Sequence, residues 1–242
     1  NCCRRAYHLT FDTSAPYAQA SFHIGGLTID GSTRYDLGKA KGHVAGDGPV
    51  VSFDVDGNGT VSTPEQHSTT MPLGAPRPVK YSYHYWSYSV GANYRLRNDL
   101  ALFGRYSRGG RANADRFVFS GNTNSASGAL LPGARPVDFV TQAEAGVKYL
   151  AHGVGLYGTA FHARTGEQNY EATTQTSFAN TYRAYGVELE GSYRTGGFNL
   201  TANGTWTHAR IVKSRTQANI GHRPRRQAAF IYRVNPSYKA GM

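Results

Sequence analysis

The chain has 242 residues and carries 26 lysines and arginines against 15 acidic residues, a formal charge of +11. This balance favours an anionic partner, such as lipid phosphate, nucleic acid or an acidic ligand, without choosing among them. No run of about 18 apolar residues occurs, which excludes a membrane-spanning helix but not membrane-spanning strands. The 29 glycines and 17 tyrosines favour β structure.

Alternation of apolar and polar residues predicts nine strands along the chain. The clearest case begins at Trp86, where every second residue is apolar or aromatic as far as Leu96, and the alternation resumes at Leu100 after three turn-forming residues. The segment 139–149 also fits a short helix. The predicted strands cover residues 16–23, 27–36, 81–96, 99–109, 139–150, 155–165, 182–194, 198–210 and 226–234.

The predicted connections alternate between short turns and long polar loops, which is the up-and-down layout of an outer-membrane barrel. A Greek-key sandwich would not alternate so strictly. The short turns are predicted at Gly25-Gly26, Arg97-Asn98, 151–154, 195–197 and Asn235-Pro236. The long loops are predicted at 37–80, 110–138, 166–181 and 211–225, with a further strand beginning at Tyr238.

Charged residues occupy one face of most predicted strands, which indicates a wet lumen rather than a packed interior. Nine strands around such a lumen do not close a small barrel, because small barrels fill their interior with side chains. The fold class expected is therefore all-β, an antiparallel up-and-down transmembrane β-barrel, and the chain is expected to be a fragment of a larger one. Tyrosines near strand ends, such as Tyr81, Tyr83, Tyr85 and Tyr185, predict an aromatic girdle, although cross-strand pairing would also place rings there.

Several stretches in this order resemble the C-terminal half of TonB-dependent receptors, over about residues 7–242. The resemblance implies a 22-strand outer-membrane barrel of a Gram-negative bacterium that imports a scarce nutrient, such as a ferric siderophore, and it implies no enzyme activity. The stretches are YWSYSVGANYRLRNDLALFGRYSRGGRANADR (85–116), QAEAGVKY (142–149), LYGTAFHARTGEQNYEATTQ (156–175), YRAYGVELEGSYRTGGFNLTANGTWTHARI (182–211) and HRPRRQAAFIYRVNPSY (222–238).

The family also has an N-terminal plug and a TonB box, and neither is found in these residues. We therefore expect residues 1–242 to form a partial barrel domain that reaches the TonB complex only through the missing plug. The resemblance further implies contact with outer-membrane lipid and lipopolysaccharide, and with a small nutrient or metal chelate. Nucleic acid is not expected as a partner, because a binder should carry its aromatic and basic residues on one face.

The sharpest motif lies inside the predicted extracellular loop 37–80 and matches the spacing of an EF-hand calcium loop over residues 54–65. Gly59 takes the position that permits the sharp turn, and Ser62 is placed to hold a water. No amphipathic helix flanks the motif, so a turn-rich loop that binds nothing is the alternative. The predicted Ca²⁺ ligands are Asp54, Asp56, Asn58, the carbonyl of Thr60 and a bidentate Glu65.

Basic residues flank two of the predicted loops, where arginine forks match phosphate and carboxylate geometry. Capture of an anionic nutrient or chelate is one interpretation; contact with lipopolysaccharide phosphates or simple solvation is the other. The adjacent Cys2 and Cys3 are too few ligands for a zinc site. The basic residues are Arg108, Arg111 and Arg116 at one loop and Arg210, Lys213, Arg215, Arg223, Arg225 and Arg226 at the other.

No nucleophile elbow, phosphate-binding loop or helical zinc-protease pattern occurs, and Glu188 with Glu190 fits a lumen lining better than an acid–base pair. Two alternatives to the transporter stay open at this point. One is a soluble calcium-binding β-sandwich or adhesin module, which would fold in water without detergent. The other is a passive outer-membrane porin.

Overall fold

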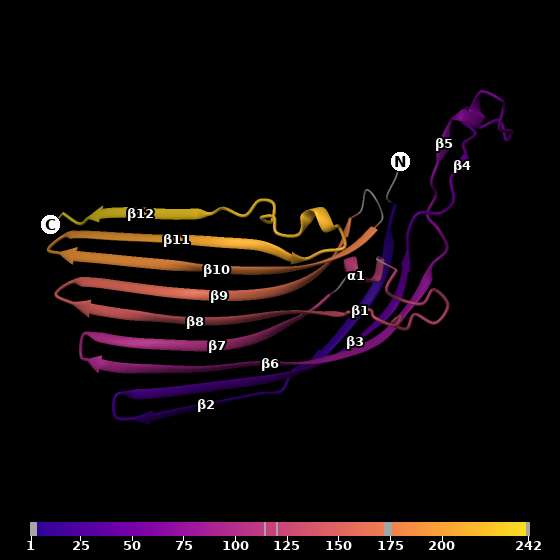
Figure 1. Ribbon diagram of the computed structural model, residues 1–242. Coiled ribbons are helices and arrows are strands. Elements are labelled where there is room, and N and C mark those ends of the chain that lie inside the picture. Colours follow the sequence, from indigo (N-terminus) through magenta and orange to yellow (C-terminus); the bar gives the residue numbers. More distant parts are fainter. Residues whose placement is uncertain (1–3, 114, 120, 172–175, 241–242) are drawn as a thin grey trace.

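The computed structural model describes residues 4–113, 115–119, 121–171 and 176–240, so Cys2 and Cys3 lie outside the described residues. Its main feature is a curved sheet of ten antiparallel strands in which almost every strand pairs with its neighbours along the chain (Figure 1). The strands of this sheet are β1 (Ala6–Ser14), β2 (Tyr17–Ile24), β3 (Leu27–Ala45), β6 (Arg77–Arg97), β7 (Leu100–Ala112), β8 (Val137–Ala151), β9 (Val154–Glu171), β10 (Thr176–Thr195), β11 (Phe198–Lys213) and β12 (Phe230–Tyr238).

The sheet does not close on itself, and its order is the meander expected of part of an up-and-down barrel. Apart from the small ribbon of β4 (Val51–Ser52) with β5 (Thr69–Thr70), the described strands form one sheet and not two packed sheets. This arrangement excludes the soluble β-sandwich. Short turns lie at one end of the sheet, here called the turn end, and the longer connections lie at the opposite loop end (Figure 1).

The first predicted strand is only half of a longer one. β1 and β2 both pair with β3, and the register runs on unchanged from Ser14–Leu37 to Tyr17–Arg34. Only Ala15 and Pro16 interrupt the strand, because proline has no N–H for the ladder. The carbonyl of Pro16 still accepts a hydrogen bond from the N–H of Tyr35 at 3.0 Å. β1 was not predicted from the sequence.

Four of the predicted tight turns are confirmed, between β2 and β3, β6 and β7, β8 and β9, and β10 and β11. Gly25, Gly153 and Gly196 supply positive φ angles of 58°, 77° and 52°. The predicted turn at Asn235-Pro236 is wrong, because both residues lie inside β12. Both residues pair with β11, Asn235 opposite Thr201 and Pro236 opposite Leu200. β12 also begins later than predicted and ends at Tyr238, where a further strand was expected to begin.

The strands extend further toward the loop end than their sequence pattern predicts, so the loops are shorter. The predicted loop 37–80 shrinks to 46–76 and holds β4, β5 and the 3-10 helix η1 (Glu65–His67). The predicted loop 110–138 shrinks to 113–136 and holds α1 (Asp115–Phe119), and 211–225 becomes 214–229 with η2 (Gln217–Asn219). β9 and β10 pair as far as Glu171 and Thr176, so only 172–175, which lie outside the described residues, are left from the predicted loop 166–181. The alternative of a helix at 139–149 is wrong, since β8 covers it.

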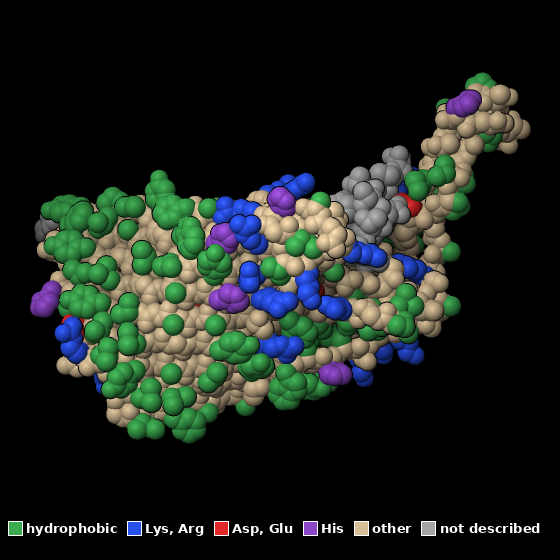
Figure 2. Space-filling model, in the orientation of Figure 1, with side chains coloured by type: hydrophobic (Ala, Val, Ile, Leu, Met, Phe, Trp, Pro, Cys, Tyr) green, Lys and Arg blue, Asp and Glu red, His purple; other side chains and the backbone are tan. Residues whose placement is uncertain are grey.

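The register separates two faces of the sheet. Trp86, Tyr88 and Val90 share one face, here called the outer face, with Tyr106 and Trp206 on neighbouring strands. All five side chains are between 40% and 53% exposed. Figure 2 shows hydrophobic side chains spread over this side of the sheet, most densely toward the turn end. An apolar face of this extent is unstable in water and suits contact with lipid.

The opposite, inner face is polar and carries ion pairs. Arg105 donates to Asp30 at 3.0 Å, Arg34 contacts Asp36 at 2.7 Å, and Arg111 contacts Asp138 at 3.5 Å. Glu144, Glu188 and Glu190 also alternate onto this face. The prediction that charged residues share one face of the sheet is therefore confirmed.

The packed core lies at the loop end, where Phe117 and Val118 of α1 cover the inner face of β3 and β6. Tyr81 and Tyr83 belong to this core and are each 7% exposed. They lie on the inner face because odd-numbered residues of β6 point away from the face that carries Trp86. Tyr81, Tyr83 and Tyr85 therefore do not belong to an outer aromatic girdle, and that prediction is wrong for these three residues. Among the residues that the structure describes, no helix has the length and apolar character needed to cross a membrane.

Candidate functional site

The calcium-loop motif folds as the tip of a two-stranded ribbon. β4 and β5 pair at Val51–Thr70 and Ser52–Thr69, and the N–H of Phe53 donates to the carbonyl of Ser68 at 2.8 Å. The ribbon therefore holds the two ends of the segment 54–65 together. Figure 1 shows it projecting from the loop end, away from the main sheet. It takes the place of the two helices that frame an EF-hand.

Asp54 organises the first half of the loop. One carboxylate oxygen accepts the N–H of Gly57 at 2.7 Å and of Asn58 at 3.2 Å, and the other accepts the N–H of Gly59 at 2.7 Å. Gly57 and Gly59 have φ angles of 72° and 87°, which non-glycine residues rarely adopt. The sharp turn predicted at Gly59 is confirmed.

Glu65 ties the second half of the loop to the first. Its Oε1 accepts the N–H of Val55 at 2.8 Å and of Asp56 at 3.3 Å, while Oε2 accepts the N–H and hydroxyl of Ser62 at 2.8 and 2.6 Å. The hydrogen bonds from Ser62, and then from the Val55 N–H, lower the pKa of Glu65 from 4.5 to about 2, against the opposing effect of burial. Glu65 is therefore ionised throughout the physiological range.

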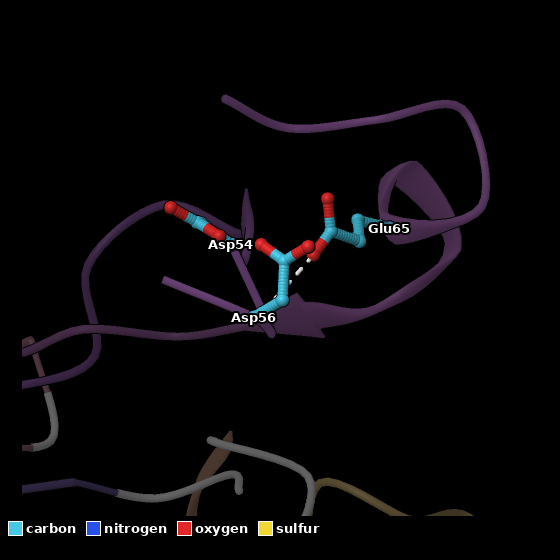
Figure 3. Close-up of side chains that lie close together, drawn as sticks. All are labelled: Asp54, Asp56 and Glu65. Atoms are coloured by element: carbon cyan, nitrogen blue, oxygen red, sulfur yellow. Dashed lines mark hydrogen bonds between the residues drawn. The ribbon is translucent and has the colours of Figure 1, made fainter. Parts of the chain in front are cut away.

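Three of the five predicted ligands converge. Carboxylate oxygens of Asp54, Asp56 and Glu65 all lie within 4.8 Å of one another. Figure 3 shows the Asp56 carboxylate beside that of Glu65, with a hydrogen bond linking the two residues. Two oxygens bound to one Ca²⁺ at 2.3–2.6 Å lie at most about 5 Å apart, so a single ion can reach all three carboxylates.

The other two predicted ligands lie on the adjoining turn. The Asn58 amide donates to Asp56 at 2.8 Å, and its oxygen accepts both the N–H and the hydroxyl of Thr60, at 2.9 and 2.7 Å. The Asn58 oxygen would therefore exchange these hydrogen bonds for a metal contact. The donor set fits a hard cation with oxygen ligands, and three carboxylates favour a divalent one.

A cavity of about 770 Å³ lies at the loop end, where the pairing of β6 with β7 stops at Tyr88 and Arg108. Its lining comes from β6, β8, β9, β10 and β11 and from residues 134–136. Tyr83 and Phe139 contribute aromatic surface to the lining, and Arg164, Lys213 and Glu167 contribute charge. This volume and mixed lining suit a small-molecule ligand.

The basic residues predicted at the loops divide between strands and connections. Arg108, Arg111 and Arg210 lie within strands, whereas Arg215, Arg223, Arg225 and Arg226 lie in the connection before β12. The side chain of Arg116 lies outside those that are described. Sequence reasoning missed Arg164 and Arg183, which share the outer face with Arg210. Both lie near the ends of the predicted strands 155–165 and 182–194, and the sequence pattern does not show that the register brings them side by side.

From the sequence we expect aromatic and basic residues to lie mostly on opposite faces, and β10 and β11 depart from this expectation. Arg183 and Tyr185 alternate onto the same outer face, as do Trp206, His208 and Arg210. The two-residue period of these strands places the arginines on the same face as the aromatic residues.

The fold is an open meander with an apolar outer face and a charged inner face. The sequence matches one family model. The family described as TonB dependent receptor-like, beta-barrel, matches residues 3–240. The chain belongs to this family. A search among curated proteins found no match.

Solved structures of TonB-dependent receptors show the same fold. The ferric yersiniabactin uptake receptor FyuA from Yersinia pestis is 19% identical, with a TM-score of 0.69 over 96% of this chain and 32% of that one. The ferric-catecholate import receptor Fiu from K12 E. coli is 17% identical, with a TM-score of 0.66 over 96% and 32%. The copper transporter OprC is 13% identical, with a TM-score of 0.65 over 96% and 34%. The chain thus spans about a third of the length of these receptors.

Proposed function

We propose that these residues form part of the barrel of an outer-membrane receptor that takes up a scarce nutrient with energy from the TonB complex. The main support for this proposal is the family match over residues 3–240. The sheet agrees with it, because its outer face is apolar and its inner face carries ion pairs. TonB would act on the whole receptor through a plug domain. The chain itself would serve as a wall and binding surface, not as an enzyme.

We propose a metal chelate, such as a ferric siderophore, as the nutrient class. Two of the similar solved receptors are described by their uptake of ferric chelates, and a third as a copper transporter. In this chain, the cavity lined by Tyr83, Phe139 and Lys213 is the candidate contact, because its aromatic and cationic side chains suit an anionic chelate.

The transport proposal is tested on the complete receptor that contains this segment, expressed in an outer membrane from which other iron receptors have been deleted. Uptake of radiolabelled iron is measured with a panel of ferric siderophores, with and without functional TonB. We expect one or more chelates to accumulate only when TonB works. Equal uptake without TonB would show a passive porin instead, and no uptake of any chelate would remove the nutrient class.

We further propose that the loop 54–65 binds Ca²⁺ at the cell exterior and that the ion rigidifies the ribbon. The support is the convergence of Asp54, Asp56 and Glu65 and the low pKa of Glu65. Calorimetric titration of the complete receptor with Ca²⁺, and with Mg²⁺ for comparison, tests it. No heat at millimolar Ca²⁺ would refute the site, and equal heat from Mg²⁺ would show a general divalent-cation loop.

A further inference from the structure

Two histidines from different strands lie side by side on the outer face at the loop end. His8 of β1 is the register partner of His43 of β3, and the two are here called the histidine pair. Their ring centroids are 5.8 Å apart, and the ring planes lie within 25° of parallel. The next residues along the two strands, Leu9 and Val44, turn inward to the loop-end core. Both imidazoles therefore point outward, where they are exposed.

Neither imidazole of the histidine pair forms a hydrogen bond or ion pair with another of the residues that the structure describes. Other histidines differ in this respect, because His23 Nδ1 lies 3.0 Å from the hydroxyl of Thr28, and His208 Nε2 accepts a hydrogen bond from Arg210 at 2.9 Å. Rotation of either ring of the pair about its Cβ–Cγ bond thus breaks no hydrogen bond. That torsion is broad for histidine, so the rotation has a small energetic cost.

The spacing of the histidine pair suits one metal ion held between the two rings. Directly opposed residues of an antiparallel pair have Cβ atoms about 4.5–5.5 Å apart. An ion bound about 2.0–2.1 Å from an imidazole nitrogen lies about 3 Å from the ring centre, so two rings on one ion have centres at most about 6.4 Å apart. The observed 5.8 Å is within this limit. Rotation of the rings is then sufficient to point one nitrogen of each at the same ion.

The two nitrogen donors determine the class of ion. Imidazole binds Cu²⁺, Ni²⁺ and Zn²⁺, whereas Ca²⁺ and Mg²⁺ prefer oxygen ligands, so the histidine pair differs in chemistry from the loop 54–65. Two protein ligands are fewer than structural or catalytic zinc sites provide. Cu²⁺ binds nitrogen ligands more tightly than Ni²⁺ or Zn²⁺ does, and it accepts a tetragonal ligand set that water can complete. The pair therefore favours Cu²⁺.

In the outer-membrane location proposed above, the histidine pair lies outside the bilayer. His43 is seventeen residues from the turn at Gly26. At about 3.3 Å per residue and a tilt of about 45°, this strand length rises roughly 40 Å, which exceeds the apolar band of about 25 Å. Lys41, the next outward residue of β3, opposes a bound dication, but its charge is exposed and is screened by salt. Ions in the surrounding water can therefore reach both rings.

We propose that His8 and His43 form a chelating site for Cu²⁺ on the cell exterior, with water or an external chelator in the remaining coordination positions. The ion would link β1 to β3 on the loop side of the interruption at Pro16, where the register already holds the two histidines opposite each other. The site is separate from the cavity proposed for the nutrient and from the proposed Ca²⁺ loop. Because its test involves no nutrient, failure of this proposal is distinct from failure of transport.

The test uses the complete receptor in detergent, stripped of metal and kept at about pH 7.5, because metal binding needs neutral imidazoles. It is titrated with Cu²⁺ bound to nitrilotriacetate, which leaves adjacent coordination positions free, and electron spin echo modulation counts the imidazoles on each ion. We compare the unmodified receptor with His8→Asn, His43→Asn and the control His162→Asn/His208→Asn. The control histidines flank Tyr185 in register, two strands apart, which is too far for them to share one ion.

We expect two imidazoles on one Cu²⁺ ion in the unmodified receptor. Either single substitution should remove this signal and weaken binding by roughly tenfold or more, because the second ligand is no longer held at a high effective concentration beside the first. The control variant should match the unmodified receptor. Unchanged binding in either single variant, or an equal loss in the control, would overturn the proposal.

A second arm needs no substitution, so it holds even if a variant fails to fold. The unmodified receptor is treated with diethylpyrocarbonate, which modifies exposed imidazoles, and each histidine is followed by mass spectrometry. Cu²⁺ should protect His8 and His43 together and leave the exposed His162 reactive, whereas Ca²⁺ should protect none of them. Equal protection of all three by Cu²⁺ would show adventitious binding only. That result, or protection of fewer than both members of the pair, refutes the site.

Discussion

At the scale of single residues, Glu65 has the most distinctive environment in the long loop. Four hydrogen bonds converge on its two oxygens, and two carboxylates lie beside it. Those bonds keep it charged, so it repels its acidic neighbours until a cation joins them. The loop thus concentrates negative charge where these three carboxylates meet.

Replacing Glu65 by glutamine should weaken Ca²⁺ binding by roughly tenfold or more, because affinity in such loops follows the number of charged ligands. Glutamine keeps the size of the side chain and one accepting oxygen. Calorimetry on the complete receptor measures the change. Glu190→Gln is the control, since it makes the same chemical change on the inner face of β10. Equal affinity of Glu65→Gln and the unmodified protein would contradict the predicted ligand set.

The low pKa of Glu65 also predicts how the loop responds to pH. A carboxyl group whose pKa is depressed in the folded state stabilises that state above its unfolded pKa. The stabilisation by Glu65 should therefore be complete above about pH 4.5 and should disappear as the pH falls toward about 2.

Hydrogen–deuterium exchange of the segment 54–65, corrected for intrinsic rates and compared between the unmodified protein and Glu65→Gln, measures this contribution. At pH 6 the unmodified loop should be better protected, and near pH 2 the difference should be gone. A difference already lost by pH 5 would show that the pKa of Glu65 is not depressed.

At the scale of elements, the long strands β3 and β6 depend on glycines that make room for tyrosine rings. A Cβ atom added at Gly38 would lie 2.0 Å from the Tyr83 ring, whereas one added at Gly31 in the same strand meets nothing closer than 3.8 Å. Tyr83 in turn packs beside Tyr81 under α1. Glycine at position 38 is thus a packing requirement of the loop-end core.

Gly38→Ala should therefore destabilise the receptor by about 1–3 kcal/mol, the usual effect of overpacking a core. Gly31→Ala is the matched control and should change stability by less than about 0.5 kcal/mol. Urea unfolding of the complete receptor in lipid vesicles, followed by tryptophan fluorescence, gives both values. Equal effects of the two substitutions would show that the Tyr83 ring moves aside freely.

At the scale of the whole molecule, the separation of an apolar face from a charged one determines which solvent each face can meet. Leu189 is 61% exposed on the outer face of β10, and its neighbours in register are Gly158 and Gly204. Because these two neighbours have no side chain, the surface around Leu189 is smooth and apolar. In the proposed location, acyl chains cover it.

Leu189→Arg should destabilise the membrane-inserted receptor by about 2–4 kcal/mol, the usual effect of arginine near the middle of the lipid face of a barrel. Asn203→Arg places the same side chain on the inner face, beside Glu190, and should be tolerated. Folding into vesicles, assayed by resistance to unfolding on cold electrophoresis and by urea titration, separates the two variants. A tolerated Leu189→Arg would place this face against water or protein.

Local sequence pattern by itself determined much of this protein. The two-residue period assigned the faces of β6 and β7 correctly, because side chains of a strand alternate whatever the strand pairs with. The glycine-containing tight turns were also predicted correctly, because such turns require backbone angles that glycine adopts readily. The spacing of Asp54, Asp56 and Glu65 also predicted a cluster that the folded ribbon brings together.

Tertiary structure alone decided which residues meet across strands. The loop-end extensions of β3 and β6 carry no clear alternation, and they persist because backbone pairing continues and α1 covers their inner face. β1 was missed because Pro16 divides one strand into two short segments. The pairing of Arg164, Arg183 and Arg210 depends on the register of β9, β10 and β11, and a shift of one residue would turn each arginine to the other face. That register is set by long-range backbone pairing, which the local pattern of each strand does not contain.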